Sequence, residues 1–194
     1  NPKHAELYRS AGFRWTPFGI EAANSKVRSG QDKKFSDDHI RKTISRVESA
    51  GISLALNYIF GLPGDTVESM QETYDLAVEL NGSFSNFYCN QALPISPQYI
   101  EAVKAGYSLP ERVGGPGWIG HSQYSYETEP FYMGDALTPA QILAFRDGAH
   151  VDYYSRPDYR SMMLANPDFG ETAMRNIDEW IKDVHSLRRR ILET

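Results

Sequence analysis

The chain has 194 residues, of which 41% are hydrophobic, enough to bury one sizeable core or one core with a small appendage. Its net charge of −5 supplies none of the basic excess that binding to a phosphate backbone requires, which argues against nucleic acid as a partner. The single cysteine, Cys89, excludes an internal disulfide framework and any iron–sulfur cluster held by several thiolates of this chain.

The sequence carries no targeting or membrane signal. It begins without an initiator Met or an apolar signal core, and no apolar run approaches the ~20 residues that span a bilayer. We therefore expect a soluble, cytoplasmic protein with no membrane partner, and we expect the first residue to lie inside a longer polypeptide.

The first half of the chain predicts strands and helices in alternation. Apolar runs predict the strands, while amphipathic spacing and N-cap residues such as Ser36 predict the helices. The predicted elements, in chain order, are a strand at 15–20, a helix at 37–50, a strand at 52–60, a helix at 67–80, a strand at 84–93 and a helix at 97–105. This order indicates an α/β fold with a parallel sheet, either doubly wound or part of a (β/α) barrel.

The character of the sequence changes after Gly106. Residues 107–136 are rich in Tyr, Ser, Glu and Gly without a helical or strand period, which predicts an irregular loop ordered by its aromatic side chains. Helices are expected from Thr138 to about 154, at 158–164 and at 171–192. The prediction is thus three segments: α/β units at 1–106, the irregular loop at 107–136 and a helical C-terminal extension at 137–194.

The functional site is expected where the parallel strands end. In this architecture the loops that follow the strands build the site, here 21–25, 61–66 and 90–96. Glu21 directly follows a buried run and can accept hydrogen bonds from a ligand; equally, it can cap its own loop or meet a nearby lysine. The Gly61–Thr66 loop can bring backbone close to a flat ligand, but taken alone it favours a tight turn with Asp65 or Thr66 as helix N-cap.

Several segments resemble the fourth and fifth β/α units of radical S-adenosylmethionine (radical SAM) enzymes in order and spacing. They are Phe-Gly-Ile-Glu-Ala-Ala-Asn at 18–24, Val27, Lys-Lys-Phe-Ser at 33–36, Ala-Gly-Ile at 50–52, Tyr-Ile-Phe-Gly-Leu-Pro-Gly-Asp-Thr at 58–66 and the helix at 70–80. Ala22, Ala23 and Asp65 depart from the usual Ser, Gly and Glu. The stretch at 92–97 resembles the family's Pro-x-Pro-Gly segment, with Ile95 in place of glycine. The resemblance covers about residues 7–105.

The resemblance implies the C-terminal half of a partial (β/α)6 TIM-like barrel with SAM lying across the carboxyl ends of the strands. Glu21 and Asn24 would contact the ribose or amino-acid part of SAM, and Lys33 would approach its carboxylate. The implied contacts with the adenine are Asn57, Ile59, Gly61 and the backbone near Leu93.

The family's CxxxCxxC cluster motif is absent from this sequence. The resemblance therefore implies that the [4Fe-4S] ligands lie in an N-terminal remainder of a parent protein, and that this fragment cannot cleave SAM by itself. We assign no metal ligand in this chain.

The C-terminal part of the chain, with Gly-His-Ser-Gln-Tyr-Ser-Tyr at 120–126, resembles cobalamin-binding radical SAM proteins less specifically. In that case the cobalamin-binding domain would also lie outside this chain.

The substrate side is the least defined part of the expected site. His121, Gln123, Tyr124 and Tyr126 can order a polar substrate, either a small molecule or a peptide, or belong to a loop that plugs the open barrel. Two other functions stay open: a non-catalytic α/β binding or scaffold domain, and a metal-free enzyme of the aldolase-barrel type. Cys89 is expected to be a core residue.

Overall fold

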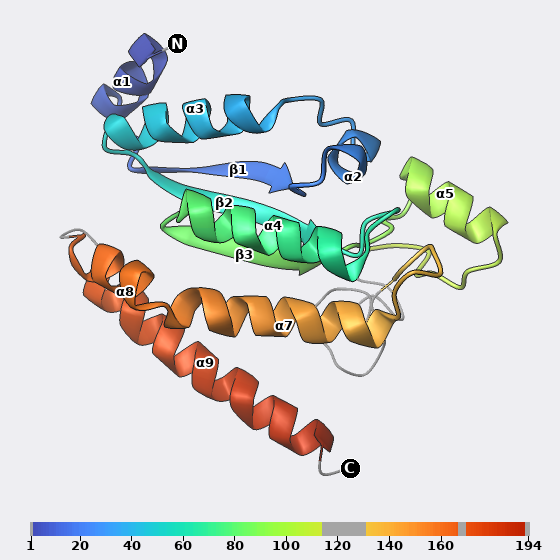
Figure 1. The fold of residues 1–194 in the computed structure, drawn as a ribbon. Coiled ribbons are helices and arrows are strands. Elements are labelled where there is room, and N and C mark those ends of the chain that lie inside the picture. Colours follow the sequence, from blue (N-terminus) through green and yellow to red (C-terminus); the bar gives the residue numbers. More distant parts are fainter. Residues whose placement is uncertain (1, 114–130, 167–169, 193–194) are drawn as a thin grey trace. The chain divides into compact units, whose positions relative to one another are not determined.

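A computed structural model describes residues 2–113, 131–166 and 170–192 (Figure 1). The chain divides into two compact units, Asn1–Arg146 and Asp147–Thr194, which are described separately. The four residues predicted for the substrate side, at 121, 123, 124 and 126, lie outside the described ranges.

The first unit contains a three-stranded parallel sheet in the order β1-β2-β3. The strands are β1 (Trp15–Glu21), β2 (Ser53–Phe60) and β3 (Phe84–Cys89). The predicted parallel α/β arrangement is thus confirmed, but β3 ends at Cys89 rather than at Leu93. Cys89 pairs with Phe60, the last residue of β2, and after one more backbone hydrogen bond, from Asn90 N to Phe60 O at 2.8 Å, the pairing stops.

Helices connect the strands and follow β3. Three of them agree with the predicted ranges to within a residue: α3 (Asp37–Ser49), α4 (Val67–Leu80) and α5 (Pro97–Lys104). Two were not predicted, α1 (Pro2–Ser10) and α2 (Ser25–Gly30). Both are too short for a clear helical period, and α2 depends on its N-cap, Asn24, rather than on an apolar stripe.

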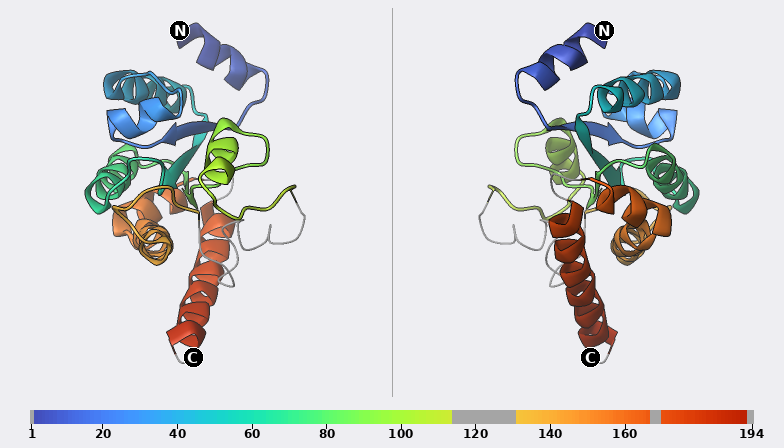
Figure 2. Two further views of the ribbon diagram at one scale, coloured as in Figure 1. Left: turned by 90° about the vertical axis from the view of Figure 1, so that its right-hand side faces the viewer. Right: turned by 90° about the vertical axis from the view of Figure 1, so that its left-hand side faces the viewer.

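One face of the sheet carries the core. Leu54, Leu56, Tyr58 and Phe60 alternate along β2 and are each at most 1% exposed, while Phe87 of β3 stacks on Phe60. Helices α3 and α4 lie along this face (Figures 1 and 2), and Tyr74 of α4 contacts the Phe87 ring. Cys89 is 2% exposed, which confirms it as a core residue.

The second unit is helical and has an aromatic core. It comprises the later part of α7 (Pro139–Ser155), α8 (Pro157–Leu164) and α9 (Gly170–Leu192), close to the predicted ranges. Tyr153 and Tyr159 are fully buried, and burial raises the pKa of Tyr159. A bidentate salt bridge joins α8 to α9: Arg160 donates to both carboxylate oxygens of Asp178, at 2.8 and 3.1 Å. Within the described ranges no helix is both long and apolar enough to cross a membrane.

Candidate functional site

The opposite face of the sheet is less covered and partly polar. Asn57, Ile59, Asn86 and Tyr88 alternate on this face and are half-buried, whereas their neighbours along the strands are buried in the core. The register sets Gly19 of β1 beside Asn57 of β2, and Asn57 beside Asn86 of β3. We call this surface the open face; its carboxyl end carries the loops predicted to build the site.

Glu21 ends β1 in an unusual conformation. Its φ of +68° lies in the left-handed region that non-glycine residues seldom adopt, and the β1–β2 register shifts between Gly19 and Glu21. The turn is tight, because Ala22 N donates to Ile20 O at 3.0 Å across Glu21. Strain of this kind is retained where surrounding structure enforces it, and it gathers at functional sites.

This turn folds the Glu21 side chain back over Gly19. A Cβ atom at Gly19 would overlap the Glu21 carboxylate and lie 3.5 Å from Lys33 Nζ. Lys33 Nζ is 3.4 Å from Glu21 Oε1; the Glu21 side chain is 16% exposed and that of Lys33 is 40% exposed. Two predicted SAM contacts therefore lie together above Gly19, beside the asparagines. This ion pair also agrees with the alternative given above, in which Glu21 pairs with a nearby lysine of the chain.

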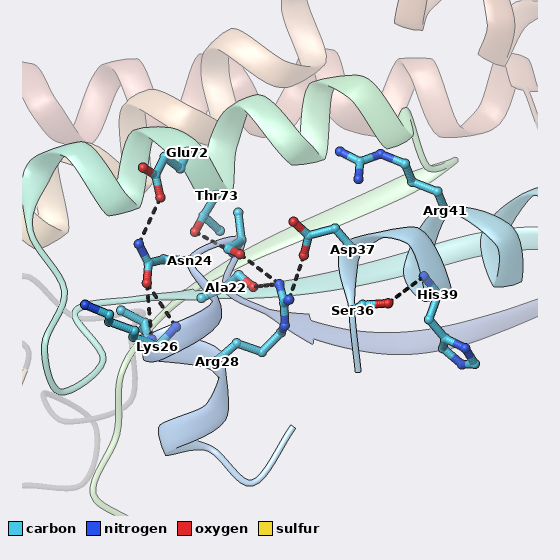
Figure 3. Close-up of polar contacts among 12 residues, drawn as sticks. Ala22, Asn24, Lys26, Arg28, Ser36, Asp37, His39, Arg41, Glu72 and Thr73 are labelled. Atoms are coloured by element: carbon cyan, nitrogen blue, oxygen red, sulfur yellow. Dashed lines mark hydrogen bonds and ion pairs between the residues drawn. The ribbon is translucent and has the colours of Figure 1, made fainter. Parts of the chain in front are cut away.

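The Asn24 side chain forms its hydrogen bonds with other residues of this chain. Its side-chain oxygen accepts hydrogen bonds from Lys26 N and Val27 N and so caps α2, and its Nδ2 donates to Glu72 of α4 at 3.1 Å. Figure 3 shows this link between the loop after β1 and α4. Asn24 thus holds the loop in place, and its predicted contact with SAM stays a prediction.

Two residues that the sequence did not single out hold the same loop (Figure 3). Arg28, only 2% exposed, donates to Ala22 O and Ala23 O at 2.9 and 2.8 Å and to Asp37 Oδ1 at 2.6 Å. Thr73 Oγ1 accepts from Ala23 N at 3.0 Å. No local sequence pattern predicts either role, because each side chain bonds to backbone atoms of the loop after β1 that come close only when the chain folds.

The Gly61–Thr66 loop is a closed turn. Buried Asp65 accepts hydrogen bonds from Leu62 N at 3.0 Å and from Ser69 Oγ at 2.5 Å, and Thr66 forms a capping box with Ser69. Burial raises the pKa of Asp65, although these hydrogen bonds oppose it. The tight turn with Thr66 as N-cap, which the loop alone favours, is thus confirmed.

A side chain at Gly61 would be strained. Its φ is +77°, and an added Cβ would lie 2.7 Å from Ile142 Cδ1 of α7. The group that approaches Gly61 in this structure is therefore an aliphatic side chain of the same chain.

The remaining predicted contacts differ in setting. Ile59 packs against a cluster formed by Ala22, Val27 and Leu62, at the carboxyl end of the sheet. Asn57 accepts a hydrogen bond from Asn86 Nδ2 at 2.9 Å. Leu93, in the loop after β3, is 47% exposed. The structure thus gathers Glu21, Lys33, Asn57 and Ile59 around one surface, and it adds Asn86.

The residues present fit the two implied cofactors differently. An iron–sulfur cluster needs several thiolates, while the one cysteine of this sequence is buried in the core, so this chain does not hold a cluster by itself. Among the described residues no group of three or more His, Cys, Asp and Glu side chains forms a metal site. SAM offers hydroxyls, an amino group, a carboxylate and a flat base, and the open face supplies a carboxylate, an ammonium, amides and apolar surface, which fit these groups.

Comparisons with known proteins find curated relatives, including the following three. Over 95 residues the chain is 27% identical to anaerobic magnesium-protoporphyrin IX monomethyl ester cyclase from Rubrivivax gelatinosus, covering 49% of this chain and 17% of that protein. It is 26% identical over 134 residues to bacteriochlorophyllide d C-12(1)-methyltransferase from Chlorobaculum tepidum, covering 69% and 28%. The cyclase from Cereibacter sphaeroides is 26% identical over 148 residues, covering 76% and 22%. The matched part of the chain thus spans between 17% and 28% of these relatives' length, and no family model matches the chain.

A solved structure shares the fold. It is that of the radical S-adenosylmethionine methyltransferase TsrM from Kitasatospora setae, with a TM-score of 0.56 and 16% identity, covering 96% of this chain and 43% of that one. The likeness of fold spans both the sheet and the helical extension. Together with the curated relatives it confirms the resemblance to the radical SAM superfamily that the Gly-Ile-Glu and Gly-Leu-Pro-Gly-Asp-Thr segments carry.

Proposed function

We propose that this chain supplies the SAM-binding side of a radical SAM site, built on the open face of a partial (β/α) barrel. One observation carries the proposal: at the carboxyl ends of parallel strands, the strained Glu21 and its partner Lys33 lie over Gly19, beside the Asn57–Asn86 pair. A set of polar groups next to apolar side chains is the usual composition of a small-molecule site.

Different residues of this chain would bind different parts of SAM. The Glu21 carboxylate accepts hydrogen bonds from ribose hydroxyls or the amino group of SAM, while Lys33 Nζ offers a positive charge to its carboxylate. Ile59 and the backbone around Gly61 give the adenine apolar surface. One electron from a cluster would cleave bound SAM into methionine and a carbon-centred radical that takes a hydrogen atom from the substrate. The cluster ligands then come from another segment, as do those for cobalamin if it is used.

The reaction type is proposed only at the level of the superfamily. The relatives include a cyclase and a methyltransferase, so they do not single out one reaction. A small-molecule substrate is the proposed partner on the open face, and the alternative is a binding domain that takes SAM without turnover.

The first test is calorimetric titration of SAM into the 194-residue chain. We expect saturable binding that Glu21→Gln weakens by about tenfold or more, the loss of one charge-assisted hydrogen bond. Glu6→Gln, on the exposed surface of α1, is the matched control and should change nothing. Equal affinity in the Glu21 variant would contradict the proposal.

A second measurement separates catalysis from binding. The chain is joined to a segment carrying CxxxCxxC, reconstituted anaerobically with iron and sulfide, and assayed for 5′-deoxyadenosine release. Release that Glu21→Gln diminishes supports a catalytic role. SAM binding without release in the joined protein favours the binding domain.

A further inference from the structure

Asn90 lies at the carboxyl end of β3, one step beyond the last residue pair of the sheet. Phe60 and Cys89 form that pair. Asn90 N then donates to Phe60 O at 2.8 Å, which brings Asn90 level with Gly61. The two-residue alternation of a strand puts the Asn90 side chain on the face that carries Tyr88, about 7 Å further along β3. Asn90 therefore lies at the edge of the surface proposed for the adenine of SAM.

The local structure does not account for an asparagine at this position. Asparagine is favoured where the backbone is left-handed, where it caps a helix, or where its amide bonds to a neighbour. The other described asparagines of the first unit each meet one of these conditions: Asn24 caps α2, Asn81 ends α4 at φ +46°, and Asn57 and Asn86 bond to each other. The backbone of Asn90 is not left-handed, and the helix that follows, α5, is capped by Ser96.

The Asn90 side chain carries an unpaired donor. Asn90 is 4% exposed, and its Nδ2 has no hydrogen-bond partner among the residues that the structure describes. A buried N–H group without an acceptor destabilises the folded chain, so native proteins rarely keep one unless it has another role. The unpaired donor thus indicates an acceptor that arrives with a ligand.

The order of the strands decides which part of a bound SAM reaches Asn90. The proposed function places the ribose and amino-acid part of SAM at Glu21 and Lys33, on the side of β1. The order β1-β2-β3 makes β1 and β3 the outer strands, about 10 Å apart. The adenine is proposed to lie on Ile59 and the backbone around Gly61, at the end of β2. The part of SAM that extends to β3 is therefore the base.

The chemistry of adenine matches an asparagine side chain. Its exocyclic amino group donates hydrogen bonds, and the ring nitrogens on either side of that group, N1 and N7, accept them. An asparagine amide offers the complementary pair, an N–H donor and a carbonyl oxygen, and bidentate pairing with asparagine is a common form of adenine recognition. The ring nitrogen supplies the acceptor that Asn90 Nδ2 lacks.

We infer that Asn90 is a specificity-determining residue for the base of SAM. Its Nδ2 donates to the ring nitrogen beside the adenine amino group, and its Oδ1 accepts from that amino group. This inference rests on the proposed function, because it takes the open face as the place where SAM lies. It adds a residue that selects adenine by the hydrogen bonds of its edge, next to the apolar surface that holds its face.

The test uses nuclear magnetic resonance titrations of the ¹⁵N-labelled 194-residue chain, with the Asn90 side-chain amide assigned by substitution. The probes are adenosine and its 1-deaza, 7-deaza and 3-deaza analogues, in each of which a C–H group replaces one ring nitrogen. We expect adenosine to shift the Asn90 amide signal. Because Asn90 is covered in the ligand-free chain, a bound base has to displace part of that cover, so signals of residues around Asn90 should shift as well.

The analogues identify the acceptor. Either the 1-deaza or the 7-deaza analogue should bind about fivefold more weakly than adenosine, the loss of one neutral hydrogen bond. The 3-deaza analogue is the matched control and should bind like adenosine, because its missing nitrogen is not beside the amino group. An Asn90 signal that does not move, or equal affinity for all four nucleosides, would overturn the inference.

Substitutions separate recognition of the base from a structural role. Asn90→Leu should bind adenosine and the disfavoured analogue equally, because the group that distinguishes them is gone. Its melting temperature should stay equal or rise, since an unpaired buried amide is removed. A preference that persists in this variant would refute the inference. Asn90→Ala serves if the leucine variant does not fold, and Gln71→Leu, which replaces an exposed amide on α4, is the matched control.

A parallel titration of SAM distinguishes this inference from the proposed function. If SAM binds and the four nucleosides do not differ, the role of Asn90 is wrong and the proposed function stands. If neither SAM nor adenosine binds, both are wrong.

Discussion

At the scale of single residues, Gly19 allows the Glu21 carboxylate to lie over β1. The carboxylate occupies the volume that a Cβ atom at position 19 would take, and the positive φ of Glu21 directs it there. A glycine in a strand costs conformational entropy and often marks a close approach by another group. Here the approaching group is the Glu21 carboxylate of the candidate site.

Gly19→Ala should therefore behave as a mutation of Glu21. The new methyl group displaces the carboxylate, so we expect SAM affinity to fall toward that of Glu21→Gln, about tenfold, in the same titration. Gly30→Ala, a position with open space and no positive φ, is the matched control. Retained affinity in the Gly19 variant would show that the carboxylate need not lie over β1.

The buried carboxyl of Asp65 makes stability depend on pH in a defined direction. Because burial raises its pKa above the ordinary 3.8, the folded protein keeps this proton to a higher pH than the unfolded chain does. Its contribution to stability is thus full below the unfolded pKa and is lost as pH rises through the folded pKa.

Asp65→Asn removes this titration. We expect the free energy of unfolding of the wild type, relative to the variant, to decrease between pH 4 and pH 7, measured by urea denaturation at both values (about the range over which a raised Asp pKa acts). Asp75→Asn, exposed on α4, controls for the substitution itself. A difference that rises with pH would mean that the hydrogen bonds outweigh burial.

At the scale of elements, Arg28 joins α2 to the loop after β1 and to the start of α3. The buried Arg28 guanidinium donates to two backbone carbonyls of the loop before α2 and to the Asp37 carboxylate, and its removal leaves the two carbonyls without these donors. The loop that carries Glu21 and Asn24 is held from this side by Arg28 and from α4 by Thr73.

Arg28→Leu should cost about 2–3 kcal/mol of unfolding free energy, because it leaves buried acceptors unpaired. Arg41→Leu breaks an exposed pair with Glu79 and should cost less than about 1 kcal/mol. Both values come from the same urea denaturation series. Similar losses in the two variants would show that the Arg28 bonds add little beyond an ordinary surface ion pair.

At the scale of the whole molecule, the sequence predicted the sheet and most helices because their signals are periodic and local. Apolar runs and caps such as Ser36 and Thr66 each lie within one element. It placed Glu21 and Lys33 at the site through family resemblance, but it missed Arg28, Thr73 and Asn86. Their roles depend on partners 5 to 50 residues away in sequence, which a local pattern does not contain.

The parallel order of the three strands has a consequence for how the chain behaves in solution. Among the described residues β1 and β3 each form a strand ladder with β2 only, so they are the two edge strands of the sheet. Edge strands are templates for additional strands, and they promote self-association unless another segment covers them. The same two edges are where further strands would attach if the sheet closes toward a barrel, so aggregation and completion of the fold compete for one set of hydrogen bonds.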